Sequence, residues 1–239
     1  NAAAEVRTVR QAVGLIDLST LAKYRVTGPD ALACLQHICA ADMDVEPGRS
    51  VYTQWLNPRG GIEADLTVIR EGADSFLVLT GAAAARRDLS WLRANLLPDA
   101  RATITDATND TAVLGLMGPK ARAVLQTLTR DDVSNEGFAF ATSRALTIAG
   151  VATRATRIPY VGELGWEIHV PNADAGRLFD AICTEGKDFN LGLVGMHAVD
   201  SLRIEKGYRH WGHDLTEDDT PIEAGLAFTV AWDKPGGFL

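Results

Sequence analysis

The chain has 239 residues, of which 46% are hydrophobic and 23% charged, and its formal net charge is −8. This is the composition of an ordinary globular protein, long enough to bury one large core or two smaller ones. The negative charge argues against nucleic acid or an anionic membrane surface as a partner, because the field of the whole molecule repels phosphate. No apolar run approaches the roughly 20 residues of a membrane-spanning helix. Cys34, Cys39 and Cys183 form no C-x-x-C pair, so we expect no disulfide framework or zinc knuckle, and a reducing compartment is favoured.

Helical and strand-like patterns follow one another along the chain without the regular βαβ alternation of a doubly wound sheet. The sequence therefore predicts an α+β fold with antiparallel sheets flanked by helices. Val26-Thr-Gly-Pro29 and Leu116-Met-Gly-Pro119 each open a helix and indicate two similar subdomains. The predicted elements, besides the hairpin described next, are helices over 5–13 (ended by Gly14), from Gly28-Pro29, over 82–97, from Gly118-Pro119, over 173–185 and over 197–206, and strands or extended runs over 15–19, 23–28, 75–80, 102–116, 138–148, 153–159 and 166–170.

A β-hairpin is predicted over residues 52–70. Apolar and aromatic side chains alternate before the turn sequence Asn57-Pro-Arg-Gly-Gly61, and a β-favouring run follows it. Asp65 stands at the start of the second strand, beside glycines that let backbone or ligand approach closely. Rigid strands would hold a carboxylate there, which makes Asp65 a candidate catalytic group. The alternative is an aspartate that closes the turn and faces water.

The segment Tyr160-Val-Gly-Glu-Leu-Gly-Trp-Glu167 places two glycines among aromatic and acidic residues. This pattern predicts a turn where a flat ligand approaches the backbone while Glu163 or Glu167 accepts its hydrogen bonds. The carboxylate of Glu167 would suit adjacent N–H groups of a heterocycle. Alternatively, Glu167 is an exposed member of an alternating strand. A glycosidase pair of Asp65 and Glu167 is a further possibility, although the sequence does not define their separation.

His210, His213 and Asp214 are residues of the kind that bind metal ions. Glycines and a tryptophan interrupt them and predict an irregular loop, and no other histidine pair completes a coordination shell. Ion pairing and capping are therefore the preferred roles, and we expect no metal site. Neither a G-x-S-x-G elbow nor a Cys-His nucleophile signature occurs, so covalent hydrolysis is not supported.

Six motifs, taken in order along almost the whole chain, resemble those of the aminomethyltransferase family. That family contains the glycine-cleavage T-protein and the folate-binding regions of dimethylglycine and sarcosine dehydrogenases. The segments ending at Glu167 and at Asp214 look more like the dehydrogenase branch. The six motifs are Asp17-Leu-Ser19, Asn57-x-x-Gly-Gly61-x-x-x-Asp65, Gly118-Pro119, Tyr160-x-Gly-Glu163-x-Gly-x-Glu167, Asp200-Ser-Leu-Arg203-x-Glu205 and Thr220-Pro-x-Glu223.

The resemblance implies a T-protein-like fold of two interleaved folate-binding subdomains. We expect one subdomain to comprise residues 1–49 and 141–231 and the other residues 50–140, with 232–239 starting a linker to a C-terminal barrel. Members of the dehydrogenase branch carry an FAD domain before this region. The absence of an initiator Met at Asn1 fits the expectation that the chain is a fragment of such a protein.

For function, the resemblance implies one-carbon transfer to tetrahydrofolate, forming 5,10-methylenetetrahydrofolate within an FAD-dependent N-methylamine dehydrogenase or oxidase. FAD would be bound elsewhere in the full-length protein, and the reacting partner would be an iminium derived from a dimethylglycine- or sarcosine-like amine. Asp65 would lie at the reactive N5/N10 side of the folate as the catalytic group, and Glu167 would hold the pterin ring. Tyr52 and Tyr160 would line the folate pocket.

Two other functions fit the same motifs. One is a flavin-free, folate-dependent aminomethyltransferase or demethylase, and the other is a folate-binding scaffold without catalysis. The presence of both Asp65 and Glu167 argues against the scaffold. The expected compartment is the cytoplasm, with the mitochondrial matrix as the alternative.

Overall fold

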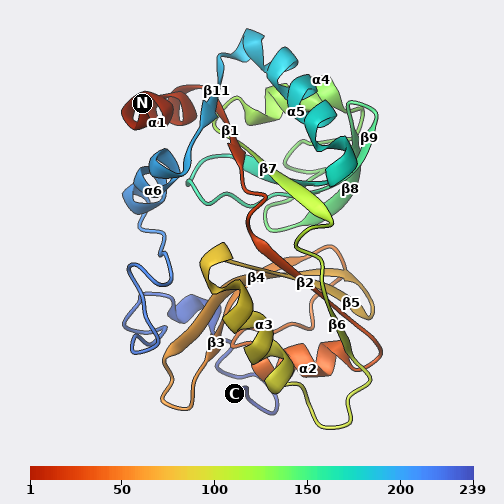
Figure 1. The fold of residues 1–239 in the computed structure, drawn as a ribbon, viewed down its shortest axis with the longest axis vertical. Helices are drawn as coiled ribbons and strands as arrows, with labels where there is room; N and C mark the ends of the chain where they lie inside the picture. The colour runs from red at the N-terminus through yellow and green to blue at the C-terminus, as the bar shows by residue number, and fades with distance from the viewer. The chain divides into compact units, whose positions relative to one another are not determined.

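The computed structural model describes residues 1–239, which form two compact units (Figure 1). Unit 1 comprises residues 1–20 and 109–208, and unit 2 comprises residues 21–108 and 209–239. Each unit contains one sheet, with a six-stranded sheet in unit 1 and a five-stranded sheet in unit 2. None of the helices combines the length and the apolar character needed to cross a bilayer.

These boundaries differ from those predicted, which were 1–49 with 141–231 and 50–140. Strand pairing explains the difference. Residues 22–27 pair with strands at 75–80 and 103–106, which keeps the chain after Thr20 in unit 2. Residues 111–117 pair with strands at 13–17 and 165–171, which brings the chain after Thr108 into unit 1. Residues 209–231 belong to unit 2 and not to the subdomain predicted for them, and residues 232–239, predicted to start a linker, also belong to unit 2.

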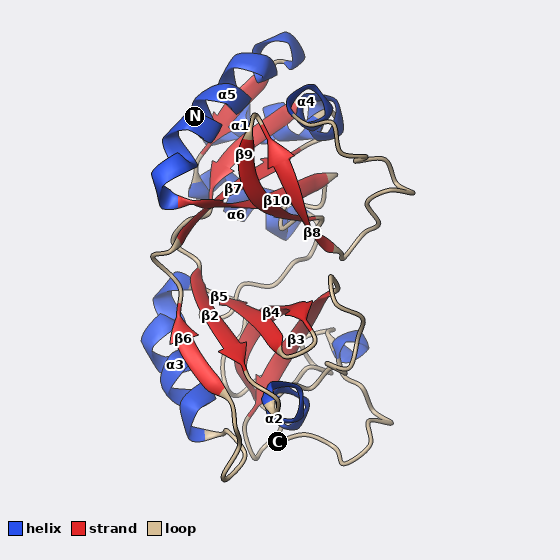
Figure 2. Ribbon diagram, turned by 90° about the vertical axis from the view of Figure 1, so that its right-hand side faces the viewer, coloured by secondary structure: helices blue, strands red, loops and turns tan.

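The sheet of unit 1 has the strand order β11-β1-β7-β10-β9-β8, and it is antiparallel except where β1 pairs with β11. Helices α4 and α5 cover one face of it (Figure 2). There Trp166, Ile168 and Val170 alternate into a core that includes Leu125 of α4 and Ile182 of α5. The elements of unit 1 are α1 (Ala2–Gln11), β1 (Val13–Asp17), β7 (Thr111–Met117), α4 (Ala121–Leu128), β8 (Ser143–Ile148), β9 (Val151–Thr156), β10 (Gly165–Pro171), α5 (Asn172–Gly186), the 3-10 helix η2 (Lys187–Phe189), β11 (Leu191–Val194) and α6 (Met196–Glu205).

The sheet of unit 2 is antiparallel, with the strand order β3-β4-β5-β2-β6. Its core contains Leu35 and Ile38 of α2 and Leu92 of α3, packed with Leu66 and Val68 of β4. The elements of unit 2 are β2 (Ala22–Thr27), α2 (Ala31–Ile38), β3 (Ser50–Leu56), β4 (Ile62–Gly72), β5 (Ser75–Thr80), the 3-10 helix η1 (Ala82–Ala84), α3 (Ala85–Ala94), β6 (Thr103–Asp106) and the 3-10 helix η3 (Ala227–Thr229). The predicted α+β class with antiparallel sheets is therefore confirmed.

The two Gly-Pro motifs occupy corresponding places in the two units. Each follows a strand and precedes an eight-residue helix, β2 and α2 in one case and β7 and α4 in the other. Gly28 has a φ of +126° and Gly118 a φ of +137°, a backbone region that only glycine adopts without strain. The repeated motif thus marks the same strand-turn-helix unit in both halves.

Three local predictions are wrong in their details. The sequence predicts that Gly14 ends the first helix, but α1 ends at Gln11 and Gly14 lies within β1. A Cβ at Gly14 would come within 2.6 Å of Val9 and 2.8 Å of Val194, so close packing explains this glycine. The predicted strand over 102–116 is two strands, β6 and β7, which belong to different sheets. The extended run predicted from Phe138 becomes a strand only at Ser143.

Candidate functional site

The β3–β4 hairpin presents one apolar face and one polar face. Trp55 pairs with Ala64 and Thr53 with Leu66, and three of these four side chains join the core formed with α2 and α3. The alternate positions point to the other face because successive strand residues project to opposite sides. On that face Gln54 stands directly across from Asp65.

Asp65 is half-buried on this polar face and has neutral partners. The Gln54 side-chain amide donates to Asp65 Oδ1 at 2.9 Å. Burial raises the pKa of Asp65 to about 6, while hydrogen bonds from Gln54 and Tyr52 act in the opposite direction. Asp65 can therefore exchange a proton near neutral pH, which is the property a general base needs. The alternative of a water-facing aspartate that closes the turn does not describe this environment.

The backbone geometry and packing of the turn beside Asp65 explain why residues 60 and 61 are glycines. Gly60 has a φ of +80°. A Cβ at Gly61 would collide with the Glu217 carbonyl oxygen, and the Asn57 side chain donates to that same oxygen at 2.9 Å. Ile62 N–H donates to the Asp219 carbonyl at 2.9 Å. The close approach predicted from Gly60-Gly61 is therefore made by the 217–219 backbone.

Glu167 lies on β10 in unit 1, between Gly115 of β7 and Thr156 of β9. Its side chain faces away from the core of α4 and α5, since the neighbouring residues Trp166 and Ile168 point into that core. The residue is only 9% exposed, and its carboxylate has no hydrogen-bonding or ionic partner within the protein. Burial raises the pKa of Glu167 to about 7. Since buried carboxylates are normally paired, this one is suited to hydrogen-bond donors of a ligand.

The loop between β9 and β10 contains Tyr160, Glu163 and a glycine with a positive φ. The Tyr160 ring lies 6.2 Å from the Tyr208 ring. Gly162 has a φ of +71°. Glu163 accepts from Arg10 Nη1 at 2.9 Å. Of the two glutamates considered from the sequence as ligand acceptors, Glu163 is thus engaged within the protein and Glu167 is not.

The four site residues fall into two pairs. Tyr52 and Asp65 belong to unit 2 and share a hydrogen bond, while Tyr160 and Glu167 belong to unit 1. Sequence reasoning missed Gln54 as a partner of Asp65. Its position on the same strand face as Tyr52, two residues away, is the signal that could have pointed to it.

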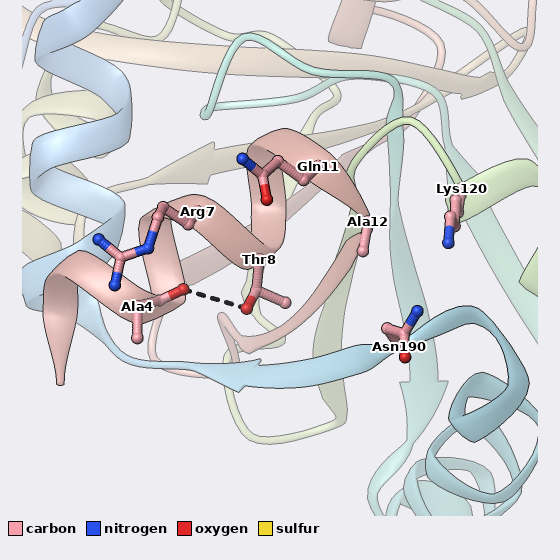
Figure 3. A pocket seen from close by; sticks show the side chains of 7 residues that line it. All are labelled: Ala4, Arg7, Thr8, Gln11, Ala12, Lys120 and Asn190. Carbon is pink, nitrogen blue, oxygen red and sulfur yellow. Dashed lines mark hydrogen bonds between the residues drawn. The ribbon is translucent and has the colours of Figure 1, made fainter.

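Two further features contain none of these residues. An open depression of about 460 Å³ beside α1 is lined in part by the cationic side chains of Arg7 and Lys120 (Figure 3). In the loop after α6, His213 Nδ1 lies 3.1 Å from Asp214 Oδ1, and the His210 backbone N–H donates to Asp214 Oδ2 at 3.0 Å. These contacts pair two side chains of the loop and form a turn in its backbone. The structure contains no cluster of three or more His, Cys, Asp or Glu side chains that could hold a metal ion.

Comparison with known proteins gives the family. Residues 1–234 match the family described as the GCVT N-terminal domain. The chain is 44% identical over 238 residues to 4-methylaminobutanoate oxidase (formaldehyde-forming) of Paenarthrobacter nicotinovorans, covering 99% of this chain and 29% of that protein. It is 39% identical over 251 residues to human mitochondrial sarcosine dehydrogenase, covering 98% of this chain and 27% of that protein.

A shorter relative and a solved structure agree with this. The aminomethyltransferase of Shouchella clausii (strain KSM-K16) is 38% identical over 236 residues, covering 98% of this chain and 64% of that protein. The crystal structure of glycine cleavage system aminomethyltransferase T from Bartonella henselae superposes with a TM-score of 0.88 at 29% identity, covering 100% of this chain and 63% of that one. The chain therefore belongs to the GCVT N-terminal domain family and is related both to dehydrogenases and to plain aminomethyltransferases, as its motifs predicted.

Proposed function

We propose that this chain binds tetrahydrofolate and catalyses the transfer of a one-carbon unit to it. The observation that carries the proposal is Asp65, a half-buried carboxylate with a pKa raised to about 6 and held by neutral donors. The family supports the assignment, because its relatives include aminomethyltransferases and an oxidase described as formaldehyde-forming.

The four site residues have different roles in binding the folate and in the transfer. Glu167 accepts N–H groups of the pterin, which fits a buried carboxylate without a partner in the protein. Tyr52 and Tyr160 line the folate pocket. The reacting iminium forms a C–N bond with a folate amine, and that amine must lose a proton as the bond forms. Asp65 takes this proton, which contributes about 10²–10⁴-fold to the rate for a well-placed general base. The second folate amine then bonds to the same carbon and loses its own proton. The bond from that carbon to the substrate amine breaks, and the amine leaves with the two protons, which gives methylenetetrahydrofolate.

We propose further that the chain is the folate-binding part of an FAD-dependent dehydrogenase or oxidase that acts on the CH–NH group of an N-methylamine such as sarcosine or dimethylglycine. The chain spans 29% and 27% of the oxidase and dehydrogenase relatives, and FAD would bind to another domain of the same protein. Its three cysteines are free thiols, which is consistent with a reducing compartment, the cytoplasm or the mitochondrial matrix.

A flavin-free aminomethyltransferase is the second candidate, because a relative of that name is 38% identical. The absorbance spectrum of the purified full-length protein separates the two. A bound flavin chromophore supports the dehydrogenase or oxidase, and folate-dependent transfer without flavin supports the aminomethyltransferase.

The role of Asp65 is tested by Asp65→Asn in the full-length protein. Asn preserves the acceptor for Gln54, so we expect folate binding to stay near wild type. Flavin reduction by the amine should also stay near wild type, because that step would take place in another domain. The yield of methylenetetrahydrofolate should fall by a factor on the order of 10² or more, with formaldehyde in its place. Both products are measured in a single turnover. Asp74→Asn, at an exposed turn of the same unit, serves as the matched control, and an unchanged folate product in Asp65→Asn would remove Asp65 from the mechanism.

A further inference from the structure

Gln54 is completely buried and uses both ends of its side-chain amide. The amide nitrogen donates to Asp65 Oδ1 at 2.9 Å, and the amide oxygen accepts from the Thr229 hydroxyl. Thr229 is itself buried, on η3 in the C-terminal segment, and its hydroxyl oxygen also lies 2.7 Å from the Leu226 carbonyl. All of these groups belong to unit 2.

The orientation of this amide follows from the chemistry of its neighbours. An ionised carboxylate can only accept hydrogen bonds, so the NH₂ group of Gln54 must face Asp65. The amide oxygen then faces Thr229, which can donate. A flipped amide would place two acceptors together at Asp65, so only one orientation satisfies both contacts.

The two partners of Asp65 differ in what they allow after proton uptake. The Gln54 NH₂ group is a donor only, so a proton on the oxygen that it contacts, Oδ1, would weaken that contact, because the hydroxyl oxygen of a carboxylic acid is a poorer acceptor than its carbonyl oxygen. The Tyr52 hydroxyl can rotate and act as donor or acceptor. A protonated Asp65 therefore keeps both partners at full strength when the proton is on Oδ2.

We propose that Gln54 is a positioning residue that holds Asp65 Oδ1 as an acceptor and directs proton uptake to Oδ2, with the Thr229 hydroxyl as the partner of its amide oxygen. This inference rests on the proposed role of Asp65 as the base. Gln54 does not itself contact the reacting atoms. It stabilises the ionised form of Asp65 and its geometry, and it links the C-terminal segment to the base.

The test uses Gln54→Leu in the full-length protein, with ionisation of Asp65 followed by its infrared carboxylate band. The band is isolated as the difference between each protein and its Asp65→Asn counterpart. Removing a donor from the charged form should move the Asp65 midpoint upward by about one pH unit, a tenfold weaker acid. The acid limb of the single-turnover rate of folate product formation should move by the same amount, with KM for folate unchanged. Thr229→Val should move both midpoints in the same direction, since it frees the amide to reorient.

Gln36→Leu is the matched control, because Gln36 makes the same type of contact to Asp42, at 2.6 Å, elsewhere in unit 2. It should leave the Asp65 midpoint unchanged. An unmoved midpoint in a folded Gln54→Leu protein would overturn the positioning role. If instead the midpoint moves while wild-type protein forms no folate product, the proposed function fails and the link between Gln54 and Asp65 stands.

Discussion

Asp65 and Glu167 are both strand carboxylates with a raised pKa, but their surroundings differ. Asp65 has two neutral hydrogen-bond partners, and its pKa of about 6 suits a group that takes and releases a proton. Glu167 has burial alone acting on it, and its pKa is about 7. An ionised Glu167 without donors is unfavourable, and hydrogen-bond donors supplied by a ligand would remove that cost.

Glu167→Gln should therefore raise stability and weaken folate binding. The pKa of Glu167 rises from 4.5 in the unfolded chain to about 7 in the folded protein. The folded state thus prefers the protonated form, whose contribution is complete below pH 4.5 and is lost as the pH rises through 7. At pH 8 the ionised group costs about 3 kcal/mol, and the glutamine avoids that cost.

The measurement is the free energy of unfolding of wild type and Glu167→Gln at pH 4.5 and pH 8, without folate. The difference should be small at the lower pH and largest at the higher one. Tetrahydrofolate affinity at pH 8 should fall by about 5- to 100-fold, because the amide presents a donor to donors of the ligand. Glu185→Gln, at an exposed position of α5, is the control for a simple change of charge. Equal stability of wild type and Glu167→Gln at pH 8 would contradict the burial assigned to Glu167.

Among the elements, the β9–β10 loop is tied to the rest of unit 1 by a side chain of α1. Arg10 Nη1 donates to the Val161 carbonyl at 2.6 Å and to Glu163 at 2.9 Å. Its Nη2 donates to the Leu202 carbonyl of α6 at 2.9 Å and to Glu205 at 2.8 Å. The planar guanidinium satisfies all four acceptors at once, which an ammonium cannot do. Arg10 thus joins α1, the loop after Tyr160 and α6.

Arg10→Lys should lower the free energy of unfolding by about 2–4 kcal/mol, because carbonyl and carboxylate acceptors lose charge-assisted partners. Exchange of the loop amides near Val161 should also speed up. The control is Arg7→Ala on the same helix, since the Arg7 side chain is exposed and its removal should change stability by less than about 0.5 kcal/mol. Similar effects of the two substitutions would show that the Arg10 contacts do not hold the loop.

Local signals explain which elements the sequence predicted correctly. The β3–β4 hairpin follows from alternation and from turn residues within about twenty positions. The strand β11 was missed because it has four residues, one of them Gly192, and is defined by parallel pairing with β1 far away in the sequence. The end of α1 was misplaced because Gly14 serves packing against Val9 and Val194 and does not cap the helix.

In the candidate site, too, local sequence patterns do not predict contacts between residues far apart in the chain. Motif residues such as Asp65 can be located from the sequence, but their partners depend on contacts that no local pattern encodes. Gln54 and Thr229 are 175 positions apart, and Arg10 and Glu163 are 153 apart. The role of Gln54 and the engagement of Glu163 are therefore visible only after folding.

At the scale of the whole molecule, the chain passes between the units three times, after Thr20, Thr108 and Tyr208. The first two crossings bound the segment 21–108, and its two ends meet at Lys23. The buried Lys23 ammonium donates to the Leu21 carbonyl at 2.9 Å and to the Thr108 carbonyl at 3.1 Å. The Ala107 N–H donates to the Lys23 carbonyl at 2.8 Å. This lysine therefore closes unit 2 where the chain enters and leaves it.

Lys23→Met should open unit 2 at this point, because methionine keeps the volume of the stem while the Leu21 and Thr108 carbonyls lose charge-assisted donors. We expect the free energy of unfolding to fall by about 2–4 kcal/mol. Hydrogen exchange of β2 and β6 amides should accelerate about tenfold for each 1.4 kcal/mol, ahead of the amides of β3 and β4. Lys187→Met, at an exposed position of unit 1, controls for loss of a positive charge. Uniform acceleration throughout unit 2 would mean that Lys23 supports its global stability and not the closure of its ends.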